Sequence, residues 1–202
     1  MALNSIAKQI IEKQLPKAAN PETQTLMNAA FLKIKEEMIA EFLQHPVTRE
    51  LQAGVDSSNI SGTLGGITNL FSFIGFRSNY DPIEPILDKL QLINIRFVTF
   101  KSKGMQYAVD MPTPKEIFDV TPLPWAQGRS WARGIESGLS GLGYYLKKDS
   151  TQSRSGFGLQ SRKRVRKGVK FKNTQYISAL INKYEKKFRT IRVWSRSINT
   201  KY

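Results

Sequence analysis

The chain contains no cysteine and only one histidine, His45, among its 202 residues. Without cysteine it can form no disulfide, no catalytic thiolate and no zinc site built on sulfur ligands. A single histidine excludes a metal site with several imidazole ligands, and any Ser-His-Asp triad would depend on that residue. No run of about eighteen apolar residues occurs, so we expect no helix that spans a membrane. Residues 1–5 lack the basic-then-apolar order of a secretory signal, so we expect none.

The motifs of common enzymes are also missing. The glycines of residues 138–143 stand in the wrong order for a dinucleotide-binding loop, and no Gly-Lys-Ser or Gly-Lys-Thr of a phosphate-binding loop occurs. Ser140 has Gly138 two positions before it but Leu142 two positions after it, so it does not match a nucleophile elbow. His45 precedes a proline at a predicted helix end, which favours capping or packing over catalysis. We therefore predict that the protein is not an enzyme and that it has no catalytic residue, metal or cofactor.

Positive charge is concentrated in the last quarter of the chain. The net charge is +15, and residues 149–202 hold 15 Lys and Arg against 2 Asp and Glu, a net charge of +13. Residues 1–100 carry a net charge of −1, and residues 101–148 carry +3. A strongly basic segment on a nearly neutral body predicts contact with a polyanion or with an acidic partner surface, and a solvated tail is the alternative.

The densest part of this charge lies in residues 162–167, where five of the six residues are Lys or Arg. Such a run binds phosphates through charge. Only Phe157 and Phe171 flank it, so it lacks the aromatic platform of a module that recognises nucleic-acid sequence. The residues that we expect to bind a partner or a polyanion are Arg162, Lys163, Arg164, Arg166, Lys167, Lys170 and Lys172.

The apolar pattern predicts an α+β fold, with N-terminal helices packed on a small antiparallel β-sheet, a basic arm and a C-terminal helix. We expect helices before Pro16 and over roughly residues 22–44, 81–92, 115–120, 128–139 and 176–188. We expect a hairpin of residues 93–101 and 105–111 with both faces covered, a strand or close-packed loop near residues 69–76, and strand character at residues 190–198. The expected divisions are residues 1–146 for the main α+β domain, 147–172 for the basic Gly/Ser/Arg/Lys-rich arm, and 173–202 for the C-terminal helix and strand-like tail.

Some of the large aromatic residues are candidates for a subunit interface. Residues 69–76 contain three phenylalanines close to glycines, which indicates tight packing or contact with another subunit. Tryptophans act most simply as core or interface anchors, and the one in the basic C-terminal strand is the best placed to face a partner. The candidate interface residues are Phe71, Phe73, Phe76, Trp125 and Trp194.

Seven stretches of the chain carry a resemblance to a known class of proteins. They are residues 45–50 (HPVTRE), 59–66 (NISGTLGG), 69–76 (NLFSFIGF), 124–131 (PWAQGRSW), 138–146 (GLSGLGYYL), 153–160 (SRSGFGLQ) and 171–178 (FKNTQYIS). Taken together they resemble virion structural proteins of marine tailed phages, cyanophages in particular, over about residues 30–185. The match is one of residue identity and order along the chain, because none of the stretches is a chemical motif.

The layout is also similar to that of head–tail joining and tail-completion proteins, in which an N-terminal helix is followed by a small antiparallel sheet and another helix. The resemblance implies a non-enzymatic subunit of a homo-oligomeric ring in the neck or at the head–tail or tail-terminator junction. Its partners would be other neck, portal or tail proteins and, without sequence specificity, phage DNA, but no membrane. It implies a virion protein assembled in the cytoplasm of a bacterial host. The alternative is a nucleic-acid-binding module that uses the basic C-terminal quarter.

Overall fold

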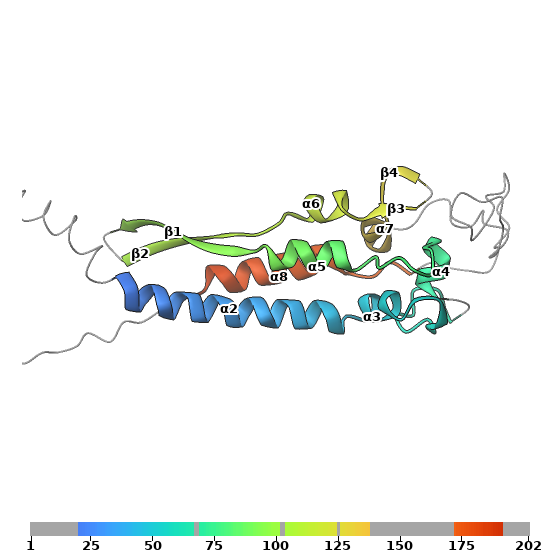
Figure 1. The fold of residues 1–202 in the computed structure, drawn as a ribbon, viewed down its shortest axis with the longest axis horizontal. Coiled ribbons are helices and arrows are strands. Elements are labelled where there is room, and N and C mark those ends of the chain that lie inside the picture. Colours follow the sequence, from blue (N-terminus) through green and yellow to red (C-terminus); the bar gives the residue numbers. More distant parts are fainter. Residues whose placement is uncertain (1–19, 67–68, 102–103, 125, 138–171, 192–202) are drawn as a thin grey trace, which may run out of the picture.

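The computed structural model describes residues 20–66, 69–101, 104–124, 126–137 and 172–191. These residues form an elongated body, and the predicted α+β class is confirmed (Figure 1). Helix α2 (Asn20–Gln44) runs along one side, and helices α5 (Glu84–Gln91) and α8 (Ile177–Arg189) pack against it. The hairpin of β1 (Asn94–Lys101) and β2 (Gly104–Asp110) lies on the opposite side of the body from α2.

Helix α2 begins two residues before its expected start and ends where expected, before His45-Pro46. Its buried face is made by large apolar side chains that recur at helical spacing, among them Phe31, Met38 and Phe42, which are at most 4% exposed. Leu26, which the apolar pattern also places on this stripe, is 45% exposed. The burial of the helix is therefore strongest in its second half, where α8 covers it.

The segment after α2 contains more helix than the sequence predicts. Helix α3 (Pro46–Gln52) starts directly at the proline, and a short 3₁₀ turn, η1 (Gly54–Asp56), follows. The expected strand or loop at residues 69–76 is wrong, because helix α4 (Leu70–Ile74) forms there. The Asn69 side chain accepts the Ser72 N–H at 2.8 Å at its start, and Gly75 ends it in the left-handed conformation at φ 91°. Almost every residue of this short helix is buried, so no apolar period is visible in its sequence.

Helix α5 begins at Glu84, with Ile83 as its N-cap residue, so the expected start with Asp81 as the N-cap is wrong by two residues. Asp81 Oδ1 accepts the N–H of Ile83 at 2.8 Å and that of Glu84 at 3.3 Å. At the other end, Lys35 Nζ donates to the carbonyls of Gln91 and Ile93, at 2.5 and 2.8 Å. This lysine therefore joins α2 to the end of α5 and to the residue before β1.

Strands β1 and β2 pair antiparallel with a bulge between Phe97 and Thr99. Ile95 pairs with Val109, and these two side chains pack against the core. The expectation that both faces are covered is wrong for the described strand residues, because Arg96, which alternates with Ile95 onto the other face, is exposed, and Val98 at the bulge is 44% exposed. The hairpin is therefore a two-stranded ribbon with one packed face and one open face.

Beyond the hairpin, helix α6 (Pro114–Asp119) opens with a capping box between Thr113 and Glu116. A second small hairpin joins β3 (Pro122–Leu123) to β4 (Ala126–Ser130), and helix α7 (Trp131–Ser137) follows it. The helix expected from residue 128 thus begins three residues later. Gly128 has φ +70° and interrupts helical geometry, and the Ser130 hydroxyl then accepts the Arg133 N–H at 3.1 Å.

Helix α8 completes the core. Four apolar residues that the sequence places on one face of this helix are all buried: Ile177, Leu180, Ile181 and Tyr184. They belong to the same hydrophobic cluster as the buried side chains of α2, α4, α5 and α7, so α8 shares one core with these four helices. The helix expected before Pro16 lies outside the described residues, as do most of the basic arm and most of the strand-like end. Thr190, where strand character is expected to begin, caps the end of α8 instead. In the part of the chain that the structure describes, no helix is long and apolar enough to cross a membrane.

Candidate functional site

Most of the predicted polyanion-binding residues lie outside the described part of the chain. These are Arg162, Lys163, Arg164, Arg166, Lys167 and Lys170. Lys172 is described and exposed, and its backbone N–H donates to the Thr63 carbonyl at 2.8 Å. This hydrogen bond holds Lys172 against the loop that precedes α4.

The candidate interface aromatics separate into two groups. Trp125 and Trp194 lie outside the described residues. Phe71, Phe73 and Phe76 are 2%, 6% and 1% exposed and belong to the core of the single chain. The structure therefore places these three phenylalanines in the tight packing that their sequence also indicates, and they expose little surface to a neighbouring subunit.

His45 joins the ends of three helices. Its Nδ1 accepts the Val47 N–H at 3.3 Å, which caps α3, and its Nε2 lies 3.2 Å from the Gln175 carbonyl just before α8. Its ring packs on Tyr176 with the two ring centroids 4.9 Å apart. Burial lowers the pKa of His45. The neutral ring, with its proton on Nε2, satisfies both hydrogen bonds, so this histidine has the capping and packing role that its position before a proline predicts.

A buried carboxylate that the sequence analysis missed organises the loop between α3 and α4. Glu50 is 0% exposed, and its two oxygens accept the Asn59 side-chain amide at 2.9 and 3.1 Å. The same carboxylate accepts the backbone N–H groups of Ser61 at 2.8 Å and Leu70 at 2.6 Å. The sequence hints at this arrangement through the polar residues that follow Asn59, but it does not indicate that Glu50 is the acceptor of their hydrogen bonds. All these contacts are structural, because they satisfy the carboxylate with donors from its own loop.

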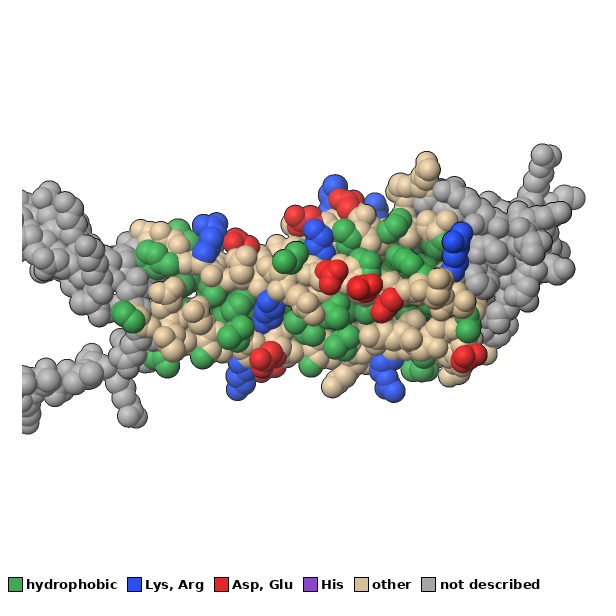
Figure 2. Space-filling model, in the orientation of Figure 1, with side chains coloured by type: hydrophobic (Ala, Val, Ile, Leu, Met, Phe, Trp, Pro, Cys, Tyr) green, Lys and Arg blue, Asp and Glu red, His purple; other side chains and the backbone are tan. Residues whose placement is uncertain are grey.

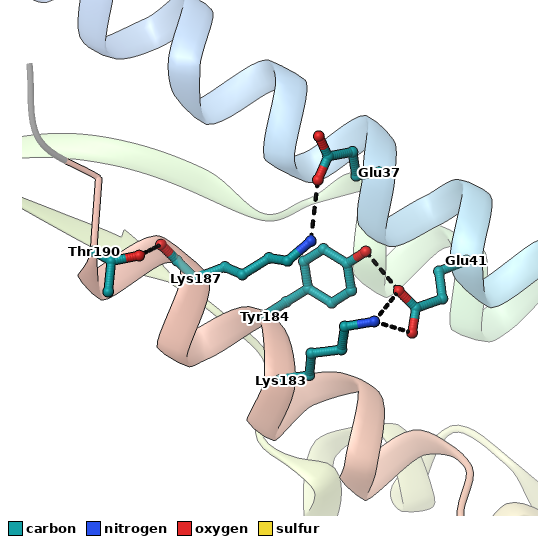
Figure 3. Close-up of polar contacts among 6 residues, drawn as sticks. All are labelled: Glu37, Glu41, Lys183, Tyr184, Lys187 and Thr190. Atoms are coloured by element: carbon teal, nitrogen blue, oxygen red, sulfur yellow. Dashed lines mark hydrogen bonds and ion pairs between the residues drawn. The ribbon is translucent and has the colours of Figure 1, made fainter.

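A second polar cluster joins α2 to α8 (Figure 3). Glu41 accepts Lys183 Nζ at 2.6 and 2.7 Å and the Tyr184 hydroxyl at 2.8 Å. One turn away, Lys187 Nζ lies 3.1 Å from Glu37 and 4.6 Å from the centre of the Tyr184 ring. The hydrogen bond from Lys183 lowers the pKa of Glu41, whereas burial raises the pKa of Tyr184. This cluster, which we call the α2–α8 seam, aligns the two helices.

Two contacts hold the start of α8 against α7. The Glu136 carboxylate accepts the Ser178 N–H at 2.7 Å and the Ser178 hydroxyl at 2.6 Å. The Thr174 N–H donates to the Ile135 carbonyl at 3.1 Å. Thr174 and Ser178 therefore lie beside α7, although residues 138–171 separate them from this helix in the sequence.

An open groove lies between α6, the β3–β4 hairpin and α7, with a volume of about 840 Å³. Its lining includes three basic side chains, Lys115, Arg129 and Arg133, and one acidic side chain, Asp119. Asp119 forms an ion pair with Lys115 at 3.0 Å. Phe118 and Leu123 supply apolar surface to the lining. We call this site the basic groove.

The described residues contain no group of three or more His, Asp or Glu that could hold a metal ion. Among their ionisable side chains, Glu50, Glu41 and His45 each hold one element of the fold to another. Comparisons of this chain with protein-family models, with curated proteins and with solved structures find no match.

Proposed function

We propose that this chain is a non-enzymatic structural subunit of a tailed-phage virion, which assembles into an oligomeric ring in the neck or at the head–tail or tail-terminator junction. Its partners are then further copies of itself and neighbouring neck, portal or tail proteins, and it reaches the virion by assembly in the cytoplasm of a bacterial host. The resemblance described above supports this proposal. The order of α2, the β1–β2 hairpin and α8 also agrees with the layout of head–tail joining and tail-completion proteins.

The observation that carries the proposal is the β1–β2 hairpin. Among the described residues it forms a sheet of two strands only, so each strand has one edge that no other described strand covers. Natural proteins usually cover such edges, and a strand of another chain can pair with them. Val98 on the hairpin and Leu92 just before it are 44% and 70% exposed. If this elongated subunit binds its neighbour through the ribbon, the two surfaces in contact are different ones. Repetition of such a heterologous contact from subunit to subunit builds a closed ring.

The assembly is tested by light scattering after size-exclusion chromatography, together with negative-stain electron microscopy. We expect the wild type to form a closed ring. Val98→Lys should abolish the ring while circular dichroism stays unchanged, because the side chain is already partly in water. Ile60→Lys is the matched control, since Ile60 is 46% exposed but lies in the loop before α4. A wild type that stays monomeric at every attainable concentration would refute the ring, and an intact ring in Val98→Lys would refute the role of the hairpin.

The second candidate function is contact with nucleic acid through the basic segment. Residues 138–171 hold 9 Lys and Arg against 1 Asp. The described chain is anchored on both sides of this segment, at α7 and at Thr63. Charge of this density binds phosphates in a salt-dependent way. The two functions are compatible, because a neck ring surrounds the path by which the genome leaves the head.

Replacing Arg162, Lys163, Arg164, Arg166 and Lys167 together by Ser tests this second function. We expect the variant to fold like the wild type but to lose DNA binding or assembly. The wild type should show the same loss at raised salt, because the Debye length falls from about 10 Å at 0.1 M to about 3 Å at 1 M. Sedimentation of both proteins across a salt series, with and without DNA, measures the effect. If both assemble alike and neither binds DNA, the segment is a solvated tail.

A further inference from the structure

We propose that residues 192–198 of this chain fold back along α8 and pair as a third strand with the open edge of β2. The site that they fill is a groove between β2 and α8, which we call the β2–α8 groove. This inference adds to the ring and to the nucleic-acid contact proposed above, and it depends on neither of them.

The β2–α8 groove lies along the edge of β2 that β1 does not cover. It has a volume of about 420 Å³, and its lining includes the three consecutive residues 107–109 of β2. Successive residues of a strand point to opposite faces of the sheet, so a groove that touches three in a row runs along the edge of the strand. The opposite edge pairs with β1, and no other described strand covers this one.

The walls of the groove are largely apolar. Ile181 and Phe188 lie on the same face of α8 and are 4% and 6% exposed, and Val109 packs against the core on the other side. The two charged residues of the lining, Glu185 and Arg189, pair with each other at 2.5 Å. The groove therefore favours an apolar occupant, and its binding should depend little on salt.

The described part of the chain ends beside this groove. Arg189, in the last turn of α8, belongs to the lining, and Ile191 packs against the core. The Ile191 N–H donates to the Phe188 carbonyl at 3.3 Å, which holds it to the end of the helix. Helix α8 runs toward the end of the body at which β1 ends and β2 begins (Figure 1). A segment that folds back from Ile191 therefore runs alongside β2 and in the same direction.

The sequence of residues 192–198 fits a strand at this position. It contains Val193, Trp194 and Ile198, which are β-branched or aromatic. Seven extended residues span about 23 Å, and β2 itself has seven residues. Trp194 and Ile198 fall on the same face of a strand, so both can point into the apolar groove, while the long side chain of Arg196 between them extends its charge to solvent.

The covalent link favours this segment over a strand of another chain. Residues 192–198 follow directly on Ile191, so their effective concentration at the groove is on the order of millimolar or higher. A second chain would have to displace them. Once β2 is covered, β1 is the strand of this hairpin whose edge a neighbouring subunit can reach.

Disulfide formation in the full chain tests the docking, because the chain has no cysteine of its own. Asn182 is exposed, lines the groove and precedes Arg189 by seven residues, which is about 10 Å along the helix. An extended segment that starts at Val193 covers this distance in about three residues, so it reaches the level of Asn182 near Arg196. We expect Asn182→Cys and Arg196→Cys, introduced together, to form a disulfide within one chain, since the bond requires neighbouring Cα atoms.

Two control pairs check the face of the strand and the side of the body. Ser195→Cys lies on the opposite face of the strand and should react with Asn182→Cys much less than Arg196→Cys does. Lys33→Cys, at an exposed position of α2, should form no disulfide with Arg196→Cys beyond the background level. Peptide mapping by mass spectrometry measures the fraction of each disulfide.

Hydrogen exchange tests the pairing with β2. Ser195→Pro and Arg196→Pro together remove the backbone N–H that faces β2, whichever of the two residues carries it. The β2 amides that point away from β1 should then exchange about two- to tenfold faster, which is the effect of one lost hydrogen bond. Asn199→Pro and Thr200→Pro, beyond the proposed strand, should leave the exchange of β2 unchanged.

Three results would overturn the inference, and none of them bears on the ring or on DNA binding. If Arg196→Cys reacts no more with Asn182→Cys than with Lys33→Cys, the segment does not occupy the groove. If the disulfide instead joins two chains when the two single variants are mixed, and none forms within a chain, the groove takes the segment of a second copy. If the two prolines leave the exchange of β2 unchanged, the segment is not paired with this strand.

Discussion

Replacing Glu50 by Gln tests whether the buried carboxylate holds the loop between α3 and α4. The carboxylate is 0% exposed and its oxygens accept hydrogen bonds from the Asn59 amide and from the N–H groups of Ser61 and Leu70. A glutamine of the same shape has one acceptor oxygen only. Its amide NH₂ would face a backbone N–H, so at least one buried donor would lose its partner.

The size of the effect follows from these contacts. A buried donor without a partner costs about 1–3 kcal/mol, and hydrogen bonds to a charged acceptor are worth about 1.5–3 kcal/mol against about 0.5–1.5 kcal/mol for neutral ones. Removal of the buried charge offsets part of this loss, because the neutral amide is easier to bury. We therefore expect Glu50→Gln to lower the free energy of unfolding by about 2–4 kcal/mol.

Urea unfolding followed by far-UV circular dichroism measures this change as a lower midpoint at unchanged slope. Glu36→Gln is the control, because Glu36 is exposed on α2 and loses the same charge. Hydrogen exchange locates the effect, since the amides of Ser61 and Leu70 should lose protection in Glu50→Gln before the amides of α2 do. A Glu50→Gln protein within about 0.5 kcal/mol of the wild type, the range of ordinary surface substitutions, would refute the reasoning.

Three further predictions follow from the core, the histidine and the α2–α8 seam. Phe73→Ala should cost about 3–5 kcal/mol of unfolding free energy, because the ring is buried in the core, and a variant that unfolds at the wild-type midpoint would contradict this. Burial lowers the pKa of His45 in the folded protein, so the unfolded chain takes up a proton first as the pH falls below about 6.5, and stability should decrease from there down to the folded pKa. His45→Asn keeps a capping side chain that does not titrate, so the unfolding free energy of this variant should fall less than that of the wild type as the pH drops below about 6.5. An equal fall in both proteins would show that His45 does not cause the pH dependence. Glu41→Gln should lower the free energy of unfolding by at most about 1 kcal/mol, because the Glu41 and Lys183 side chains are 40% and 50% exposed. High salt should remove most of the difference between the variant and the wild type, and a difference that salt leaves unchanged would contradict this.

The elements that the sequence predicts well are those whose pattern is local. Helices α2 and α8 carry apolar residues at helical spacing, and the β1–β2 hairpin has β-branched and aromatic strands around a turn with Gly104. In each helix the residues that determine the structure lie within one or two helical turns of each other. In the hairpin they lie in two strands joined by a short turn. A single sequence is therefore enough to predict these elements.

The remaining features depend on partners that are distant in the sequence. Glu50 follows an exposed arginine on a short helix, and nothing near it indicates that Leu70 will donate to it. Helix α4 has no visible period because nearly all its residues are buried. The basic groove likewise combines Lys115 of α6 with Arg133 of α7, and nothing in the sequence indicates that these two helices lie side by side. Charge alone indicates the predicted binding residues of the basic arm, and their role stays a prediction.

The contact between α2 and α8 has a consequence for the synthesis of the chain. Glu41 and Lys183 are 142 residues apart, and Phe31 and Phe42 of α2 pack on Phe188 and Tyr176. A ribosome that adds about 5–20 residues per second needs on the order of ten seconds to make the intervening chain. During that time α2 exists with its aromatic face uncovered, and contacts between such distant segments also form slowly. The nascent protein therefore passes through a period in which chaperones can bind this face or other chains can associate with it, and that period ends only when α8 is made and docks.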